Sequence, residues 1–197
     1  MYRLILLIFV FVFRSNELFA MDIEGFWETI EVANEKLELQ PLQADYLIDA
    51  FGELSKSRLI ASYEIFESIV EELDCNNVYA LGSVIKGEPL TDDGFRYFRS
   101  WLVTLGKDVV EGAIDDPVSL LKDEEIKHCL LNSEIEFEDF HYFIDDAFTS
   151  KFEASVYDVA RDVMTLTKKH HDPMTMEYIA VQYADLMSII GRSQGQP

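Results

Sequence analysis

Residues 91–105 read TDDGFRYFRSWLVTL, and this stretch decides the fold. Thr91 has a hydroxyl that can accept from exposed backbone N–H groups at a helix start, and two aspartates follow where the helix dipole is positive. Tyr97 and Trp101 widen the apolar stripe to most of the helix circumference. We therefore predict a buried, central helix. Its stripe consists of four residues at helical spacing: Phe95, Phe98, Leu102 and Leu105.

Helical spacing also governs the rest of the chain from Met21 onward. No run alternates with period two, and no internal repeat of about 20 to 50 residues occurs. We predict an all-α fold, a single irregular domain of about eight to ten helices without a substantial sheet. Besides the central helix, apolar stripes lie in these segments: 23–33, 42–54, 57–73, 76–85, 109–114, 117–121, 126–131, 136–152, 155–167 and 174–190. Ser57 is the predicted cap of the helix in 57–73, and Phe137 and Phe140 are predicted to face inward from the helix in 136–152. We divide the chain into a leader (1–20), a helical core (21–154), C-terminal helices packed on it (155–190) and a loose tail (191–197).

The leader has the layout of a secretory signal peptide. Arg3 precedes ten apolar residues, 4–13, and Ala20 stands at a possible cleavage point. The apolar run is too short for a transmembrane anchor, which needs roughly 20 residues. The alternative is that translation starts at Met21. The protein is cytoplasmic in that case, and secreted or periplasmic if the leader is real.

The net charge is strongly negative. The chain has 16 basic and 37 acidic residues, a formal charge of −21, and residues 21–197 alone carry −22. This sign excludes a protein that holds nucleic-acid phosphates or anionic lipid over its whole surface. A basic protein partner is the class that the charge favours.

Catalytic and metal-binding signatures are missing from the sequence, which contains no H-E-x-x-H, no G-x-S-x-G and no phosphate-binding glycine loop. We expect no cofactor and no metal site. His141 falls on an apolar helix face and is expected to be half-buried and hydrogen-bonded, and His170 and His171 to lie in a polar turn. Cys75 and Cys129 lie in no C-x-x-C pattern and are read as buried thiols, or as one disulfide if the chain is exported.

Acidic residues crowd the segment 134–146. A solvated face explains them most simply, a docking surface for a basic protein is the functional alternative, and a cation site lacks EF-hand spacing. The partner-binding candidates are Glu136, Asp139, Asp145 and Asp146.

A second candidate group lies on the central helix: Asp92, Asp93, Arg96, Arg99 and Trp101. Asp92 and Arg96 are spaced as a favourable i, i+4 ion pair, and the two arginines could grip a carboxylate or phosphate. Helix capping with internal ion pairs explains the same residues more simply. The ligand-binding interpretation requires them to converge on a concave site that solvent reaches.

The pattern D-D-G-F-x-x-F-R-x-W-L at residues 92–102, together with the opening segment 21–27, Gly106-Lys107 and Asp115-Asp116-Pro117, resembles the bacterial family named domain of unknown function 4240. The resemblance covers residues 21 to about 151. It implies a compact helical domain, carries over no activity, and favours Met21 as the start. Residues 81–87 depart from the family pattern, which is richer in small and polar residues there.

Two functional hypotheses remain. The first is a non-enzymatic interaction domain, immunity-like or regulatory, that binds a basic partner through its acidic surface. The second is a small-ligand-binding protein or enzyme with its site around Asp92, Asp93, Arg96, Arg99 and Trp101.

Overall fold

The structure, a computed structural model, describes residues 21–34, 43–132, 135–136, 138–160, 171–172 and 174–193. The described residues contain twelve helices and no strand, so the prediction of an all-α fold is confirmed. In chain order the helices are α2 (Ile23–Asn34), α3 (Gln43–Gly52), α4 (Lys56–Glu72), α5 (Asn76–Lys86), α6 (Asp92–Thr104), α7 (Lys107–Asp115), α8 (Pro117–Leu120), α9 (Glu124–Asn132), α10 (Asp139–Phe152), α11 (Val156–Val159), α12 (Met176–Gln182) and α13 (Ala184–Ser193). The leader 1–20 lies outside the described residues, as do residues 194–197 of the predicted loose tail, whereas residues 191–193 belong to α13 and are helical rather than loose.

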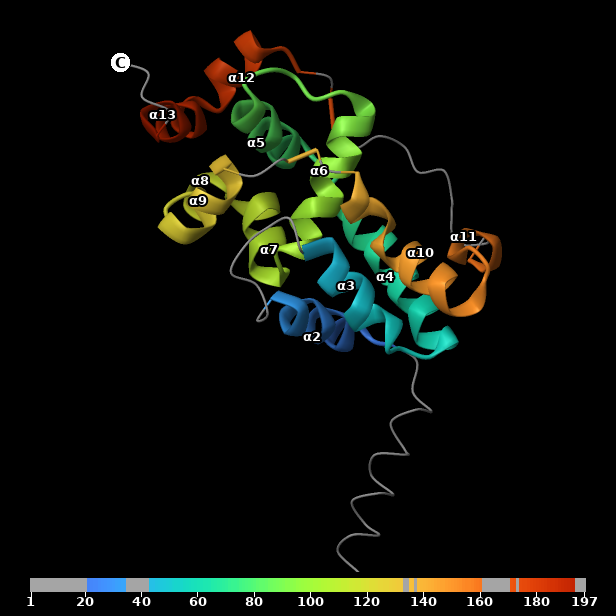
Figure 1. Ribbon diagram of the computed structural model, residues 1–197. Helices are drawn as coiled ribbons and strands as arrows, with labels where there is room; N and C mark the ends of the chain where they lie inside the picture. The colour runs from blue at the N-terminus through green and yellow to red at the C-terminus, as the bar shows by residue number, and fades with distance from the viewer. Residues whose placement is uncertain are drawn as a thin grey trace, which may run out of the picture.

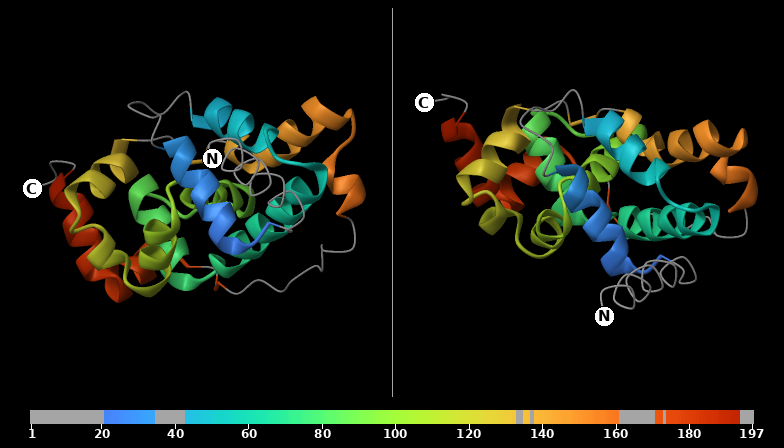
Figure 2. Two further views of the ribbon diagram at one scale, coloured as in Figure 1. Left: turned by 90° about the horizontal axis from the view of Figure 1, so that it is seen from below. Right: turned by 60° about the horizontal axis from the view of Figure 1, so that its bottom comes forward.

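Helix α6 is central, as its sequence predicts. It packs against α4, α5, α7 and α10, and it crosses the middle of the molecule in Figure 1. Phe95, Phe98, Trp101 and Leu102 are buried, whereas Leu105 is only partly buried. α11 and α13 lie at opposite ends of the molecule (Figure 2).

Local capping signals place several helix starts. The Thr91 hydroxyl accepts from Gly94 N at 3.0 Å, and Asp116 Oδ1 accepts from Ser119 N at 3.0 Å beside Pro117. The start of α4 differs from the prediction, because the cap is Ser55 rather than Ser57. The number of helices also exceeds the predicted range. One reason is that the predicted segment 174–190 is interrupted at Tyr183, where α12 ends and α13 follows.

Two close contacts with the central helix α6 require glycine. A Cβ at Gly82 of α5 would lie 2.7 and 2.8 Å from two ring carbons of Phe98. A Cβ at Gly94 would overlap the Glu136 carboxylate, which lies directly over the first turn of α6. These two contacts fix how α5 and the segment before α10 lie against the central helix.

The region after α11 packs back on the core. Helices α12 and α13 both contact α5, and α13 also contacts α8. Asp172 N donates to Asn76 Oδ1 at 2.8 Å, and Tyr183 Oη donates to Asn77 Oδ1 at 3.4 Å. The predicted helix 155–167 is described only as far as residue 160, and α11 within it ends at Val159.

Candidate functional site

Arg96 points inward from α6 and joins three helices. Its Nη2 donates to both carboxylate oxygens of Glu67 on α4, at 3.1 and 2.9 Å, and its Nε donates to His141 Nε2 on α10 at 3.2 Å. A guanidinium only donates, so Nε2 must be the unprotonated nitrogen of His141. The proton is therefore on Nδ1, which lies 3.1 Å from Ser100 Oγ and donates to it. Both ring nitrogens of His141 are thus occupied.

Burial sets the charge states in this cluster. His141 is only 8% exposed, and burial, with help from Arg96 and Arg99, lowers its pKa to about 4, so the imidazole is neutral near pH 7. Burial also raises the pKa of Glu67, and Arg96 offsets part of that rise. His141 is hydrogen-bonded as predicted, but it is buried rather than half-buried.

Arg99 and Trp101 are more deeply buried than Arg96. Arg99 Nη1 donates to Val70 O at 2.8 Å and lies 3.6 Å from Asp74 Oδ2, and the guanidinium covers the Phe95 ring at 4.6 Å. Burial lowers the pKa of Arg99. Trp101 is fully buried. Asp92 and Asp93, in contrast, are exposed at the start of α6. Arg96 and Arg99 thus pair with internal carboxylates and Trp101 is buried, whereas Asp92 and Asp93 lie at the exposed start of α6.

The candidates near α10 fall into two groups. Glu136 and Asp145 have internal partners: Glu136 lies 2.7 Å from Lys86 Nζ, and Asp145 Oδ1 accepts from Ser155 Oγ and Val156 N at 2.8 and 2.7 Å. Asp139 and Asp146 are exposed. Burial, followed by repulsion from Asp145 and Asp139, raises the pKa of Asp146.

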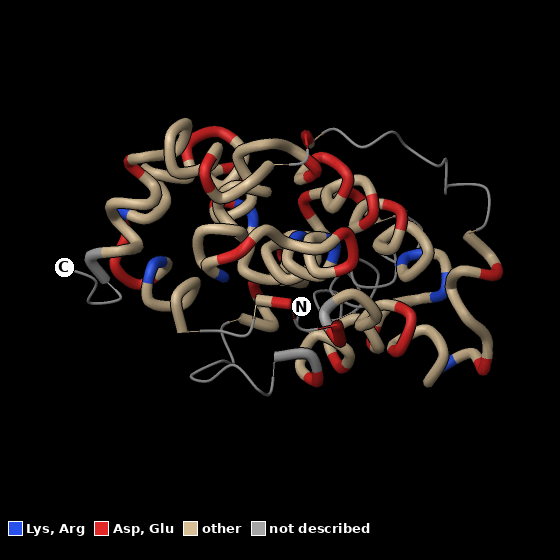
Figure 3. Tube along the Cα trace, turned by 90° about the horizontal axis from the view of Figure 1, so that it is seen from above, with Lys and Arg blue, Asp and Glu red and all other residues tan. Residues whose placement is uncertain are grey.

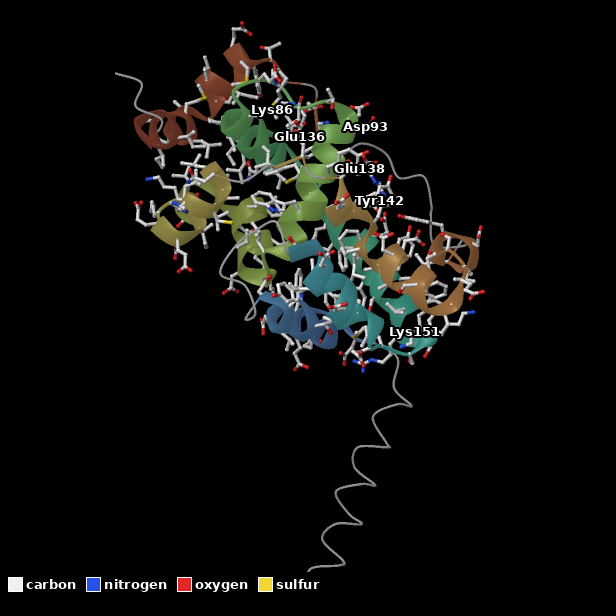
Figure 4. The ribbon with its side chains drawn as sticks, in the orientation of Figure 1. Lys86, Asp93, Glu136, Glu138, Tyr142 and Lys151 are labelled. Atoms are coloured by element: carbon white, nitrogen blue, oxygen red, sulfur yellow. The ribbon has the colours of Figure 1, made fainter. Side chains whose placement is uncertain are left out.

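Two tyrosines and a glutamate that the sequence analysis did not select lie beside these carboxylates. Tyr97 Oη donates to Glu138 Oε1 at 3.1 Å, and burial together with Glu138 raises the pKa of both Tyr97 and Tyr142. Figure 4 shows Asp93, Glu138 and Tyr142 together where α6 and α10 begin. We name this surface the α6–α10 acidic face and define it as Asp93, Tyr97, Glu138, Asp139, Tyr142 and Asp146.

His171 lies in a bend before α12, within the segment predicted as a polar turn, and His170 lies outside the described residues. His171 is buried, stacks on Tyr79 with 4.8 Å between ring centroids, and meets the edge of Phe95. Its Nδ1 lies 2.5 Å from Asp74 Oδ1. The burial of His171 was not predicted because its partners lie far away in sequence. Its role in the structure is to attach the C-terminal region to the core.

Cysteines and metal-binding groups give no further candidate site within the part of the chain that the structure describes. Neither Cys75 nor Cys129 is in a disulfide, and both are partly buried. The described residues hold no group of three or more His, Cys, Asp or Glu that could bind a metal ion. Of the helices described, none combines the length and apolarity that crossing a bilayer requires.

A family model described as "Protein of unknown function (DUF4240)" matches residues 21–150. The chain belongs to the DUF4240 family. The match contains α6, the cluster around Arg96 and the α6–α10 acidic face, whereas α12 and α13 lie beyond it. Comparisons with curated proteins and with solved structures gave no match. DUF4240 membership therefore supports the predicted resemblance and assigns no activity.

Proposed function

We propose that this DUF4240 chain is a protein-interaction domain that binds a basic protein partner through its α6–α10 acidic face. The partner would present Lys or Arg side chains to the carboxylates of Asp93, Glu138, Asp139 and Asp146. Charge complementarity of this kind speeds association and disfavours wrong partners.

The single observation that supports this proposal most is the internal use of the positive charges. In the described residues, Arg96 pairs with Glu67, Arg99 with Asp74, and Lys86 with Glu136. Lys151 donates to the carbonyls of Gly52 and Leu54 at 2.6 and 2.7 Å. Acidic residues outnumber basic ones along the molecule in Figure 3, so much of the surface negative charge is uncompensated.

Tyr97 and Tyr142 add aromatic rings to the charged side chains of this face. Tyr97 and Tyr142 are partly exposed, and aromatic rings attract Lys and Arg by cation–π contact worth about 0.5–1 kcal/mol at exposed positions. Tyrosine is also enriched where protein partners bind. A pair of tyrosine rings beside four carboxylates suits a basic side chain better than either feature alone.

Capture from cells that make this protein tests the proposal. The immobilised chain is incubated with lysate at low and high salt, and bound proteins are identified by mass spectrometry. We expect a basic protein at low salt that is released at high salt, because screening weakens exposed charge pairs.

Two charge-matched variants make the test specific. The first neutralises the face: Asp93→Asn, Glu138→Gln, Asp139→Asn and Asp146→Asn. The control neutralises four exposed carboxylates elsewhere: Glu28→Gln, Glu31→Gln, Asp115→Asn and Glu125→Gln. The proposal expects the first variant to lose the basic partner and the control to keep it. Equal loss in both variants, or no basic protein at low salt, contradicts it.

A further inference from the structure

Two tyrosine rings with buried hydroxyls meet at the junction of α4 and α11. Tyr63 on α4 is 2% exposed, and its ring meets that of Tyr157 on α11 edge to face, with centroids 5.3 Å apart. Neither hydroxyl has a hydrogen-bond partner among the described residues, and both oxygen atoms are shielded from solvent. An unpaired buried hydroxyl costs about 1–3 kcal/mol, so two at one place require an explanation.

The surrounding protein groups already have partners. Asp145 accepts from Ser155 and from the backbone of Val156, and Glu67 accepts from Arg96. Both carboxylates act electrostatically on Tyr63 and on Tyr157, and Arg96 acts on Tyr63 as well. Burial is the main cause that raises the pKa of each phenol. Each hydroxyl therefore keeps its proton and can both donate and accept a hydrogen bond.

The charges define what could satisfy the two hydroxyls. An anion would be repelled by Glu67 and Asp145. A cation would lose its hydration beside carboxylates that already accept hydrogen bonds. A neutral molecule that donates and accepts meets no such penalty, and water is the smallest one.

We propose that a water molecule occupies an internal site between α4, α10 and α11 and bridges the hydroxyls of Tyr63 and Tyr157. The site attaches α11 to the core where α11, which follows the end of α10, packs against α4. A bridging water is enthalpically nearly as good as a direct hydrogen bond.

A double-mutant cycle on the full chain tests this site. Tyr63→Phe and Tyr157→Phe keep both rings and remove only the hydroxyls, so folding is preserved. If water bridges them, each substitution lowers Tm by about 2–4 °C, the shift expected for one hydrogen bond in a chain of this size. The double variant then falls by less than the sum of the two, because both substitutions remove the same bridge.

Two control substitutions calibrate the cycle. Tyr79→Phe removes a direct bond to Leu90 O at 3.0 Å and should lower Tm, whereas Tyr178→Phe, at a residue 52% exposed, should not. A high-resolution crystal structure should show one oxygen within hydrogen-bond distance of both phenols. Single variants that melt at or above the parent temperature, additive losses, or an empty site overturn the proposal.

Discussion

Replacing His141 by a residue that does not titrate should remove a specific part of the pH dependence of stability. The folded chain keeps this imidazole neutral down to about pH 4, whereas its ordinary pKa is 6.5. Between these values the unfolded chain binds a proton that the folded chain does not. The stability that neutral His141 provides is therefore complete above the unfolded pKa and is lost as pH falls toward the folded one.

The magnitude follows from these two values. From about pH 8 to about pH 5, the difference in proton binding at His141 should lower the free energy of unfolding by about 2 kcal/mol. Urea unfolding followed by circular dichroism measures it in the parent and in His141→Asn, whose amide does not titrate in this range. Glu67 acts in the opposite direction, since its raised pKa gives stability that is lost as pH rises, but it is present in both chains.

His128 supplies the matched control because it is exposed. The free energy of unfolding of His128→Asn should fall with pH as that of the parent does. For His141→Asn, the fall from about pH 8 to about pH 5 should be about 2 kcal/mol smaller than in the parent. If His141→Asn and the parent lose stability in parallel, His141 is not held neutral in the folded state, and the assigned direction of its hydrogen bonds fails.

Other substitutions test the packing and the helix ends. Gly82→Ala should lower the free energy of unfolding by about 1–3 kcal/mol despite a helix-propensity gain of about 1 kcal/mol, because its Cβ would press on buried Phe98. Gly191→Ala in α13 has no heavy atom within 4 Å of its Cβ, so urea unfolding should show the propensity gain alone. Lys151→Met should lower Tm by a few degrees, about 1 kcal/mol, since it leaves two carbonyls at the end of α3 without their ammonium partner. Gly94→Ala should destabilise by about 1–3 kcal/mol by displacing the carboxylate that lies over it, and an unchanged melting curve would refute that contact.

The parts of the fold that sequence predicts are those with local causes. Thr91 and Asp116 cap helices because a hydroxyl or carboxylate at that position meets N–H groups only three residues away. The apolar stripe of 91–105 likewise decides what α6 buries. Ser57 was the wrong cap for α4 since Ser55, two residues earlier, offers the same chemistry. Local signals therefore predict elements well and their boundaries less well.

The parts that sequence did not predict depend on contacts between distant residues. Spacing relates Arg96 only to Asp92 on its own helix, whereas the structure also shows Arg96 bound to Glu67 and His141 on other helices. Asp74 is 97 residues from His171, so no periodicity could relate them. Phe137 and Phe140 were predicted to face inward, and their side chains lie outside the described residues.

The roles of the candidate acidic residues likewise depend on contacts that the sequence does not reveal. Their crowding in sequence was evident, yet only the structure separates Asp145, which holds the start of α11, from Asp139 and Asp146, which face solvent. Tyr97 and Tyr142 carried no signal that distinguishes them from core aromatics. Their partial exposure next to Glu138 is a tertiary property.

The most direct test of the proposed function is the salt dependence of binding to the captured basic partner, measured by calorimetry for the parent chain and for the two charge-matched variants. The parent and the control should lose affinity steeply as salt rises, while the variant neutralised at the α6–α10 acidic face should start weaker and lose much less. Identical salt slopes for all three chains would contradict the claim that this face binds the partner.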